Sequence, residues 1–252
     1  MLRRELRNGI LILRLDIPEK LNAWSAALRG EIAETLNASA TDPAVKAVVI
    51  TGTGERAFCA GADLSDPTMG DPDASKDRMV AYHAFYLSVL SFPKPLVAAL
   101  NGMALGSALQ VILLMDARIG HDQVRLSMPE INSGMPCITG ATILLDVLGP
   151  ILARDLCISG RFVESAEAAR LGLIDALVPR EEVLDRAIET ARFLAGKTPE
   201  AFAETKLWLC EQFRPSLDSA FARAAEVRGK EHVARHVRSG IRDFFDHPKP
   251  AN

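Results

Sequence analysis

Apolar and polar residues follow two spacings along the first two thirds of the chain. Short leucine-rich or β-branched runs, typical of strands, occur at 10–15, 45–51, 96–100 and 117–120. Stretches with apolar residues at helical spacing lie between them, at 26–36, 79–90 and 105–115. Because strands that alternate with helices pack as layers, this pattern predicts an α/β fold.

From about Ser165 onward the pattern becomes almost entirely helical. Helical stretches separated by Gly or Pro are predicted at 166–171, 183–194, 201–213 and 217–237. We therefore expect two parts, a core over residues 1–195 and a helical C-terminal subdomain over residues 196–252.

Composition narrows the class of protein. The 252 residues are 48% hydrophobic and carry a formal net charge of −3, so the chain can bury a large core and has no general attraction for nucleic acid or an anionic membrane. No apolar run reaches the length of a membrane span, and the start lacks the apolar core of a signal peptide. The four cysteines are far apart and lack metal-ligand spacing, which predicts reduced thiols, no metal site and a cytoplasmic protein.

Two turns rich in small residues carry the candidate chemistry. Ala57 to Leu64 (AFCAGADL) follows a predicted strand, and Asn101 to Ser107 (NGMALGS) leads into a predicted helix. Gly61 lets the backbone turn sharply and approach a ligand, and the first N–H groups of a helix have no partner within it. The two turns predict two backbone donors aimed at one oxygen, although a turn such as the first also forms simply to pack a strand against a loop.

These turns and further motifs together resemble the crotonase superfamily, also called the enoyl-CoA hydratase/isomerase family. The resemblance runs nearly from end to end. It rests on PEKLNA at 18–23, the AFCAGADL turn, KPLVAALNG at 94–102, SMPEI at 127–131, SGRF at 159–162, AARLGLID at 168–175 and VP at 178–179. Each string alone is a weak signal, whereas their shared order and spacing make the resemblance specific.

The resemblance implies a spiral of ββα units, which forms the catalytic core, and a helical C-terminal region that supports trimerisation, as a homotrimer or a dimer of trimers. It implies an acyl thioester of coenzyme A as the substrate, so no separate cofactor is expected. In the family, two main-chain N–H groups hold the thioester oxygen; here they belong to Ala62 and Ser107, the latter standing where glycine is usual. Further contacts to the substrate and its coenzyme A are expected at Leu21, Ala23, Ala60, Asp63, Leu64 and Gly106.

One of the two carboxylates common in hydratases of this family is missing. Glu130 matches the second glutamate, whereas Gln110, three residues after Ser107 and on the same helical face, stands where the first belongs. An amide does not exchange a proton with substrate as a carboxylate does. One carboxylate can move a double bond by shuttling a proton between C2 and C4, whereas adding water needs more groups. The sequence therefore favours enoyl-CoA isomerisation, with hydration of a 2-enoyl-CoA as the alternative.

Other interpretations of the same residues stand beside this one. Taken alone, Glu130 is a solvated loop acid, and Gln110 is either a hydrogen-bonded core amide or a group that positions a catalytic water. The missing carboxylate also fits a catalytically weak protein that binds acyl-CoA or serves assembly. Asp116 is expected to be structural, as a cap or salt-bridge partner. Residues 66–76 and 135–142 are expected to wall the acyl pocket, and their sequences do not reveal the acyl group.

Overall fold

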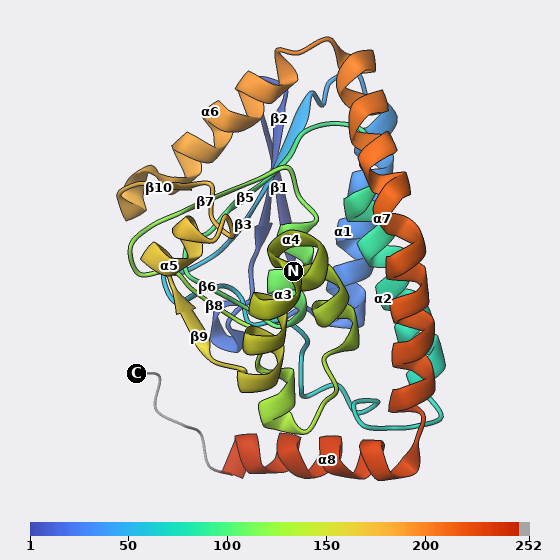
Figure 1. Cartoon of the computed structure of the whole chain (residues 1–252). Coiled ribbons are helices and arrows are strands. Elements are labelled where there is room, and N and C mark those ends of the chain that lie inside the picture. The colour runs from blue at the N-terminus through green and yellow to red at the C-terminus, as the bar shows by residue number, and fades with distance from the viewer. Residues whose placement is uncertain (247–252) are drawn as a thin grey trace.

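The strands form two sheets, which the chain visits in turn (Figure 1). The computed structural model describes residues 1–246, apart from the side chain of Phe244. The larger sheet contains, in order across it, β1 (Leu2–Arg7), β2 (Ile10–Leu15), β3 (Ala47–Gly52), β5 (Leu96–Ala99), β7 (Ala117–Gly120) and β10 (Ala176–Leu177). The smaller sheet contains β4 (Ala57–Cys59), β6 (Met103–Leu105), β8 (Arg125–Ser127) and β9 (Phe162–Glu164). The pairs β1/β2 and β8/β9 are antiparallel, and the other neighbours are parallel.

Successive ββα units each place one strand in either sheet. β3 and β4 are followed by α2 (Ser75–Leu90), β5 and β6 by α3 (Ser107–Leu113), and β7 and β8 by the 3-10 helix η2 (Pro129–Ser133) and α4 (Ile138–Ser159). The remaining helical elements are η1 (Pro18–Lys20), α1 (Ala26–Thr41), α5 (Ser165–Arg170), η3 (Arg180–Glu182), α6 (Val183–Ala195), α7 (Pro199–Arg228) and α8 (Glu231–Asp246). The α/β class and the spiral of ββα units are confirmed.

The middle strands β3 and β5 of the larger sheet are buried on both faces, which explains why they are nearly continuous apolar runs rather than alternating ones. In β3, Ala47 and Val49 belong to the apolar layer that α6 covers, while Val48 and Ile50 face the main core. Side chains alternate between the faces of a strand, so one short run supplies both layers. The sheet is thereby a rigid support for the turns at its strand ends.

The C-terminal helices differ from the prediction. The expected helices at 201–213 and 217–237 are wrong in their boundary, because α7 continues through Pro215 and the break falls at Gly229. Proline removes one backbone hydrogen bond, but Leu217 and Phe221 are buried in the main core, and α7 packs on α2 and α4. In Figure 1, α7 runs along one side of the molecule and α8 crosses its end. The division at residue 195 stays a prediction.

Two further differences concern the middle of the chain. The hydrophobic pattern does not predict α4, because Gly149 and Pro150, two helix-breaking residues, stand in the middle of this segment. In the structure Gly149 has a non-helical φ of 73°. The helix expected from Leu105 begins at Ser107, since Leu105 ends β6 and pairs with Ser127 of β8.

Asp116 ties the start of one strand to α7. Its Oδ2 accepts hydrogen bonds from the Leu96 N–H and from Lys206 Nζ, each at 2.7 Å. The structural role predicted for Asp116 is therefore confirmed, in its form as a salt-bridge partner. Across residues 1–246, no helix combines the length and the apolarity needed to cross a membrane.

Candidate active site

The two turns predicted from small residues lie against each other. Gly61 has a φ of +88°, and a Cβ atom built on it would lie 2.6 Å from the carbonyl oxygen of Leu105. Gly106, the next residue along the second turn, has a φ of +54°. Both the left-handed φ and the close approach require glycine at position 61, because any side chain there would push the turns apart.

Trp24 joins the two turns. Its main-chain N–H donates to the Gly61 carbonyl at 2.9 Å, and its indole Nε1 donates to Ser107 Oγ at 3.0 Å. The hydroxyl that Ser107 carries in place of the usual glycine is thus an acceptor for a buried indole. Trp24 is not among the residues predicted from the sequence, although a tryptophan beside the PEKLNA motif is a signal, since a buried indole needs a partner for its N–H.

The main-chain N–H groups of Ala62 and Ser107 find no acceptor within the part of the chain that the structure describes. Both residues line the same cavity. Because a backbone donor normally has a partner, two unpaired donors on one cavity wall are available to an oxygen of a bound ligand. α3 has only seven residues, so the donors themselves, rather than a long helix dipole, are the useful feature.

Glu130 lies on η2, and its side chain is buried at this cavity, with the residue 9% exposed. Burial raises the pKa of the carboxyl group above its ordinary value. Oε1 lies 3.2 Å from the position that a Cβ atom on Gly106 would take, so glycine leaves the space that the carboxylate fills. Among residues 1–246, Oε2 has no hydrogen-bond partner. The interpretation of Glu130 as a solvated loop acid is therefore wrong.

Gln110 holds Glu130 in place. Its Nε2 donates to Glu130 Oε1 at 2.8 Å, and its Oε1 accepts from the hydroxyls of Tyr86 at 3.0 Å and Thr139 at 2.8 Å. The two hydroxyls and the carboxylate fix which way the amide faces, because only the NH₂ group can donate to a carboxylate. The amide oxygen thus already accepts two hydrogen bonds, so this geometry supports the core-amide interpretation of Gln110.

The cavity has a volume of about 110 Å³ and brings together seven of the ten predicted site residues. These are Ala60, Ala62, Leu64, Gly106, Ser107, Gln110 and Glu130. They come from the β4 turn, the start of α3, and η2, segments that are adjacent only because the ββα units stack.

The other three predicted residues, Leu21, Ala23 and Asp63, do not line this cavity. Leu21 lies next to it, since its carbonyl accepts from the Ala60 N–H at 3.0 Å. Ala23 is buried, and the carboxylate of Asp63 pairs with Lys20 Nζ at 3.0 Å. Contacts from these three residues to coenzyme A stay a prediction.

One wall of the cavity was not predicted from the sequence. Met135 and Thr139, from the predicted wall segment 135–142, line it, and Met69 is the lining residue from segment 66–76. Pro129 and Ser133 of η2 also line the cavity without having been predicted, and the other unpredicted residues come from α2 and α7: Arg78, Met79, Tyr82, Tyr86, Phe221 and Arg228. Their spacing is that of ordinary core helices, so their shared position is a property of how α2 and α7 pack.

Known proteins match this chain along nearly its full length. The family model for enoyl-CoA hydratase/isomerase matches residues 5–251. The 2,3-dehydroadipyl-CoA hydratase of Escherichia coli (strain K12) is 31% identical over 242 residues, which cover 96% of this chain and 94% of the relative. The short-chain-enoyl-CoA hydratase of Clostridium acetobutylicum is 28% identical over 247 residues, which cover 97% and 94%.

The structural comparison agrees. The structure of Pseudomonas aeruginosa OdaA has a TM-score of 0.86 and 32% identity, covering 96% of this chain and 98% of that one. The match to the family model agrees with the site, which contains two adjoining turns with unpaired N–H donors and a buried carboxylate. The chain belongs to the enoyl-CoA hydratase/isomerase family, the crotonase superfamily, and is an enzyme that acts on acyl-CoA.

Proposed function

We propose that this enzyme moves the double bond of a 3-enoyl-CoA to C2, with Glu130 as the group that transfers the proton. The observation that carries the proposal is that the two carboxylate oxygens of Glu130 have different surroundings. Gln110 holds Oε1 at 2.8 Å, while Oε2 has no partner within residues 1–246 and belongs to a residue that lines the cavity. One carboxylate with one unpaired oxygen is what a proton shuttle needs.

The reaction balances with that single group. Glu130 takes a proton from C2, the C2–H electrons form a C1=C2 bond, and the carbonyl electrons move onto the thioester oxygen. The carbonyl then re-forms, the C1=C2 electrons become the C2=C3 bond, and the C3=C4 electrons take up at C4 the proton that Glu130 returns. Negative charge collects on the thioester oxygen between the two steps, where the N–H groups of Ala62 and Ser107 would donate to it. Removing one such donor typically costs about 100- to 1000-fold in rate, so the pair can supply a large part of the required stabilisation.

The buried position of Glu130 suits this role. A solvated glutamate is a weak base, whereas burial raises the pKa of the Glu130 carboxyl and so makes the carboxylate a stronger proton acceptor. The same carboxyl group then holds the proton well enough to deliver it to C4.

Hydration of a 2-enoyl-CoA is the second candidate, favoured by the names of the relatives from Escherichia coli and Clostridium acetobutylicum. It would require Gln110 to help orient a water molecule. The hydrogen bonds of Gln110 to Tyr86, Thr139 and Glu130 would have to be shared or exchanged to do so.

The deciding experiment uses 3-enoyl-CoA and 2-enoyl-CoA thioesters with four to six acyl carbons, with neutral and with charged acyl ends, in deuterated water. Isomerisation gives a 2-enoyl product without added water, whereas hydration gives a 3-hydroxyacyl product that is heavier by one D₂O. We expect the 3-enoyl substrates to be isomerised faster than the 2-enoyl substrates are hydrated. Faster hydration would establish the second candidate instead.

Glu130→Gln tests the base directly. We expect its rate to fall about 100- to 10,000-fold, the usual contribution of a positioned acid–base group. Glu181→Gln, at an exposed site on η3, is the matched control and should leave the rate unchanged. A Glu130→Gln enzyme as fast as the wild type would remove the proton-transfer role, and a wild type that binds acyl-CoA but converts none would favour a binding protein.

A further inference from the structure

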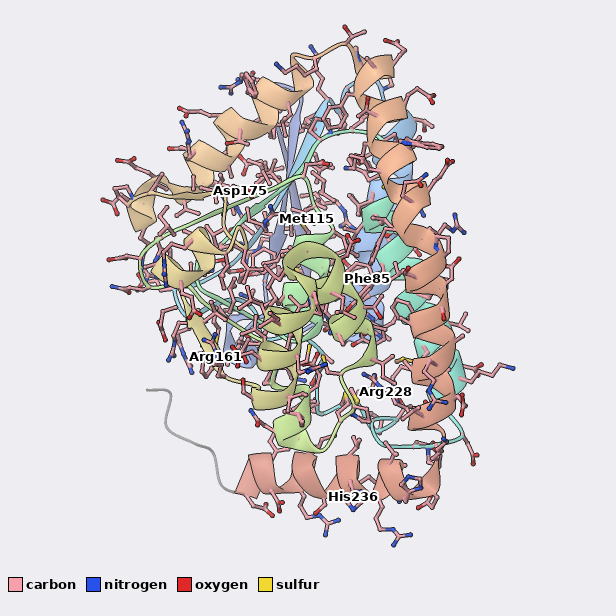
Figure 2. All side chains as sticks on the ribbon, viewed as in Figure 1. Phe85, Met115, Arg161, Asp175, Arg228 and His236 are labelled. Atoms are coloured by element: carbon pink, nitrogen blue, oxygen red, sulfur yellow. The ribbon has the colours of Figure 1, made fainter. Side chains whose placement is uncertain are left out.

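Positively charged side chains gather on the cavity wall that α2 and α7 form. Arg78 and Tyr82 are one turn apart on α2, and Arg228 is the last residue of α7 (Figure 2). All three line the same cavity as Glu130. Arg29 of α1 adds a third guanidinium, whose carbon lies 3.8 Å from the centre of the Tyr82 ring. The wall is therefore strongly cationic although the whole chain is slightly acidic.

These charges are not neutralised within the fold. Within residues 1–246, none of the three arginines has a carboxylate at ion-pair distance. Asp66 and Glu130 act on Arg78 and Arg228 only from farther away. Burial, followed by repulsion from Arg228, lowers the pKa of Arg78. Arginines that repel one another in a buried wall weaken the fold unless something compensates them.

Several buried polar groups on the same wall lack a hydrogen-bond partner among residues 1–246. Arg78 is 9% exposed, and its Nη1 donates to the Thr68 carbonyl, but its Nε is buried without a partner in the described part of the chain. Within residues 1–246, Arg228 Nε is likewise buried and unpartnered, and the hydrogen-bond partner of its Nη1 is the Met79 sulfur at 3.7 Å. Among residues 1–246, the Tyr82 hydroxyl is a third buried group without a hydrogen-bond partner. Unsatisfied donors on two cationic side chains call for an anionic acceptor.

The location of these groups indicates which part of a ligand they meet. The cavity that they line also contains Ala62, Ser107 and Glu130, where the thioester would react, so the acyl group rather than the nucleotide would enter it. The cavity volume of about 110 Å³ favours a short acyl group.

We propose that the acyl group of the substrate is short and ends in a carboxylate, which the guanidinium groups of Arg78 and Arg228 bind. The inference rests on the proposed acyl-CoA chemistry at the same cavity and names its substrate class. The terminal carboxylate supplies both the negative charge and the acceptor oxygens that the wall lacks, and a planar guanidinium matches a carboxylate in shape.

Binding of unreactive thioesters tests the inference apart from turnover. Titration calorimetry compares adipyl-CoA with hexanoyl-CoA, and glutaryl-CoA with pentanoyl-CoA; each pair differs only in the terminal carboxylate. We expect at least one carboxylated ligand to bind about 30-fold more tightly than its neutral partner, as for a buried charge pair. The coenzyme A phosphates are common to both ligands and cancel. A wild type without this preference would overturn the inference, whatever reactions it catalyses.

Arg228→Met then tests the wall. We expect the preference to fall to about threefold or less while binding of the neutral ligand changes little, and Arg228→Lys to restore part of the preference because it keeps the charge. Arg223→Met, at an exposed site on the same helix, is the matched control and should keep the full preference. Equal weakening of both ligands in Arg228→Met would show that Arg228 only supports the fold. A preference without isomerisation would keep this inference and refute the proposed reaction; isomerisation without a preference would do the reverse.

Discussion

Gln110→Met separates a residue that positions Glu130 from one that contacts the substrate or a water. Methionine keeps the length of the side chain and removes the N–H that donates to Glu130 Oε1 at 2.8 Å. A hydrogen bond to a charged group contributes about 1.5–3 kcal/mol, and one pKa unit corresponds to about 1.4 kcal/mol. Losing this donor disfavours the carboxylate form, so the pKa of Glu130, already raised by burial, should rise by about 1–2 further units.

The assay is the pH dependence of kcat/KM for isomerisation. Glu130 accepts a proton only when it is ionised, so activity increases as pH rises through its pKa. In Gln110→Met the acidic limb of the profile should therefore move about 1–2 pH units higher, while the plateau at high pH changes little. Tyr86→Phe and Thr139→Val each remove one donor to the Gln110 oxygen but leave its N–H in place, and they should shift the limb less.

The opposite pattern would refute this reasoning. If the acidic limb of Gln110→Met stays in place and the rate falls equally at every pH, Gln110 does not act through the pKa of Glu130. The amide would then contact the substrate or a water, as the hydration mechanism requires.

Three other predictions concern stability and packing. Because the folded pKa of Glu130 is raised, its contribution to stability is fully present below the unfolded pKa of about 4.3 and is lost as pH rises through the folded pKa. Relative to the wild type, Glu130→Gln should therefore gain unfolding free energy as pH rises from about 4 to about 8. Urea unfolding that gives the same difference between the two proteins at every pH would contradict this. Gly106→Ala should lower kcat/KM about 100-fold, since its Cβ would lie 3.2 Å from the Glu130 carboxylate, whereas Gly172→Ala, at another positive φ with open space, should not. Lys206→Met breaks the 2.7 Å pair with Asp116 and should cost about 2 kcal/mol of unfolding free energy, with loss of α7 anchoring seen by hydrogen exchange; no change would mean that the pair adds nothing.

The four middle strands of the larger sheet could be predicted because their signal is local. Runs such as 47–50 and 96–100 are continuously apolar, and burial on both faces demands that composition whatever their neighbours are. α7 could not be bounded in the same way, because Pro215 is a local signal for a break that packing against α2 and α4 overrides. The three-residue strands of the smaller sheet are too short to show any periodicity.

The sequence by itself determined the family, the two small-residue turns and the replacement of one carboxylate by Gln110, because each depends on which residues occur in which order. Only the tertiary structure decided that Gln110 holds Glu130 rather than staying available to water, and that Arg78 and Arg228 meet on one cavity wall. The physical reason is that hydrogen bonds and charge repulsion act over a few ångströms in space. Residues 150 positions apart come that close only after α2 and α7 have packed against the same core.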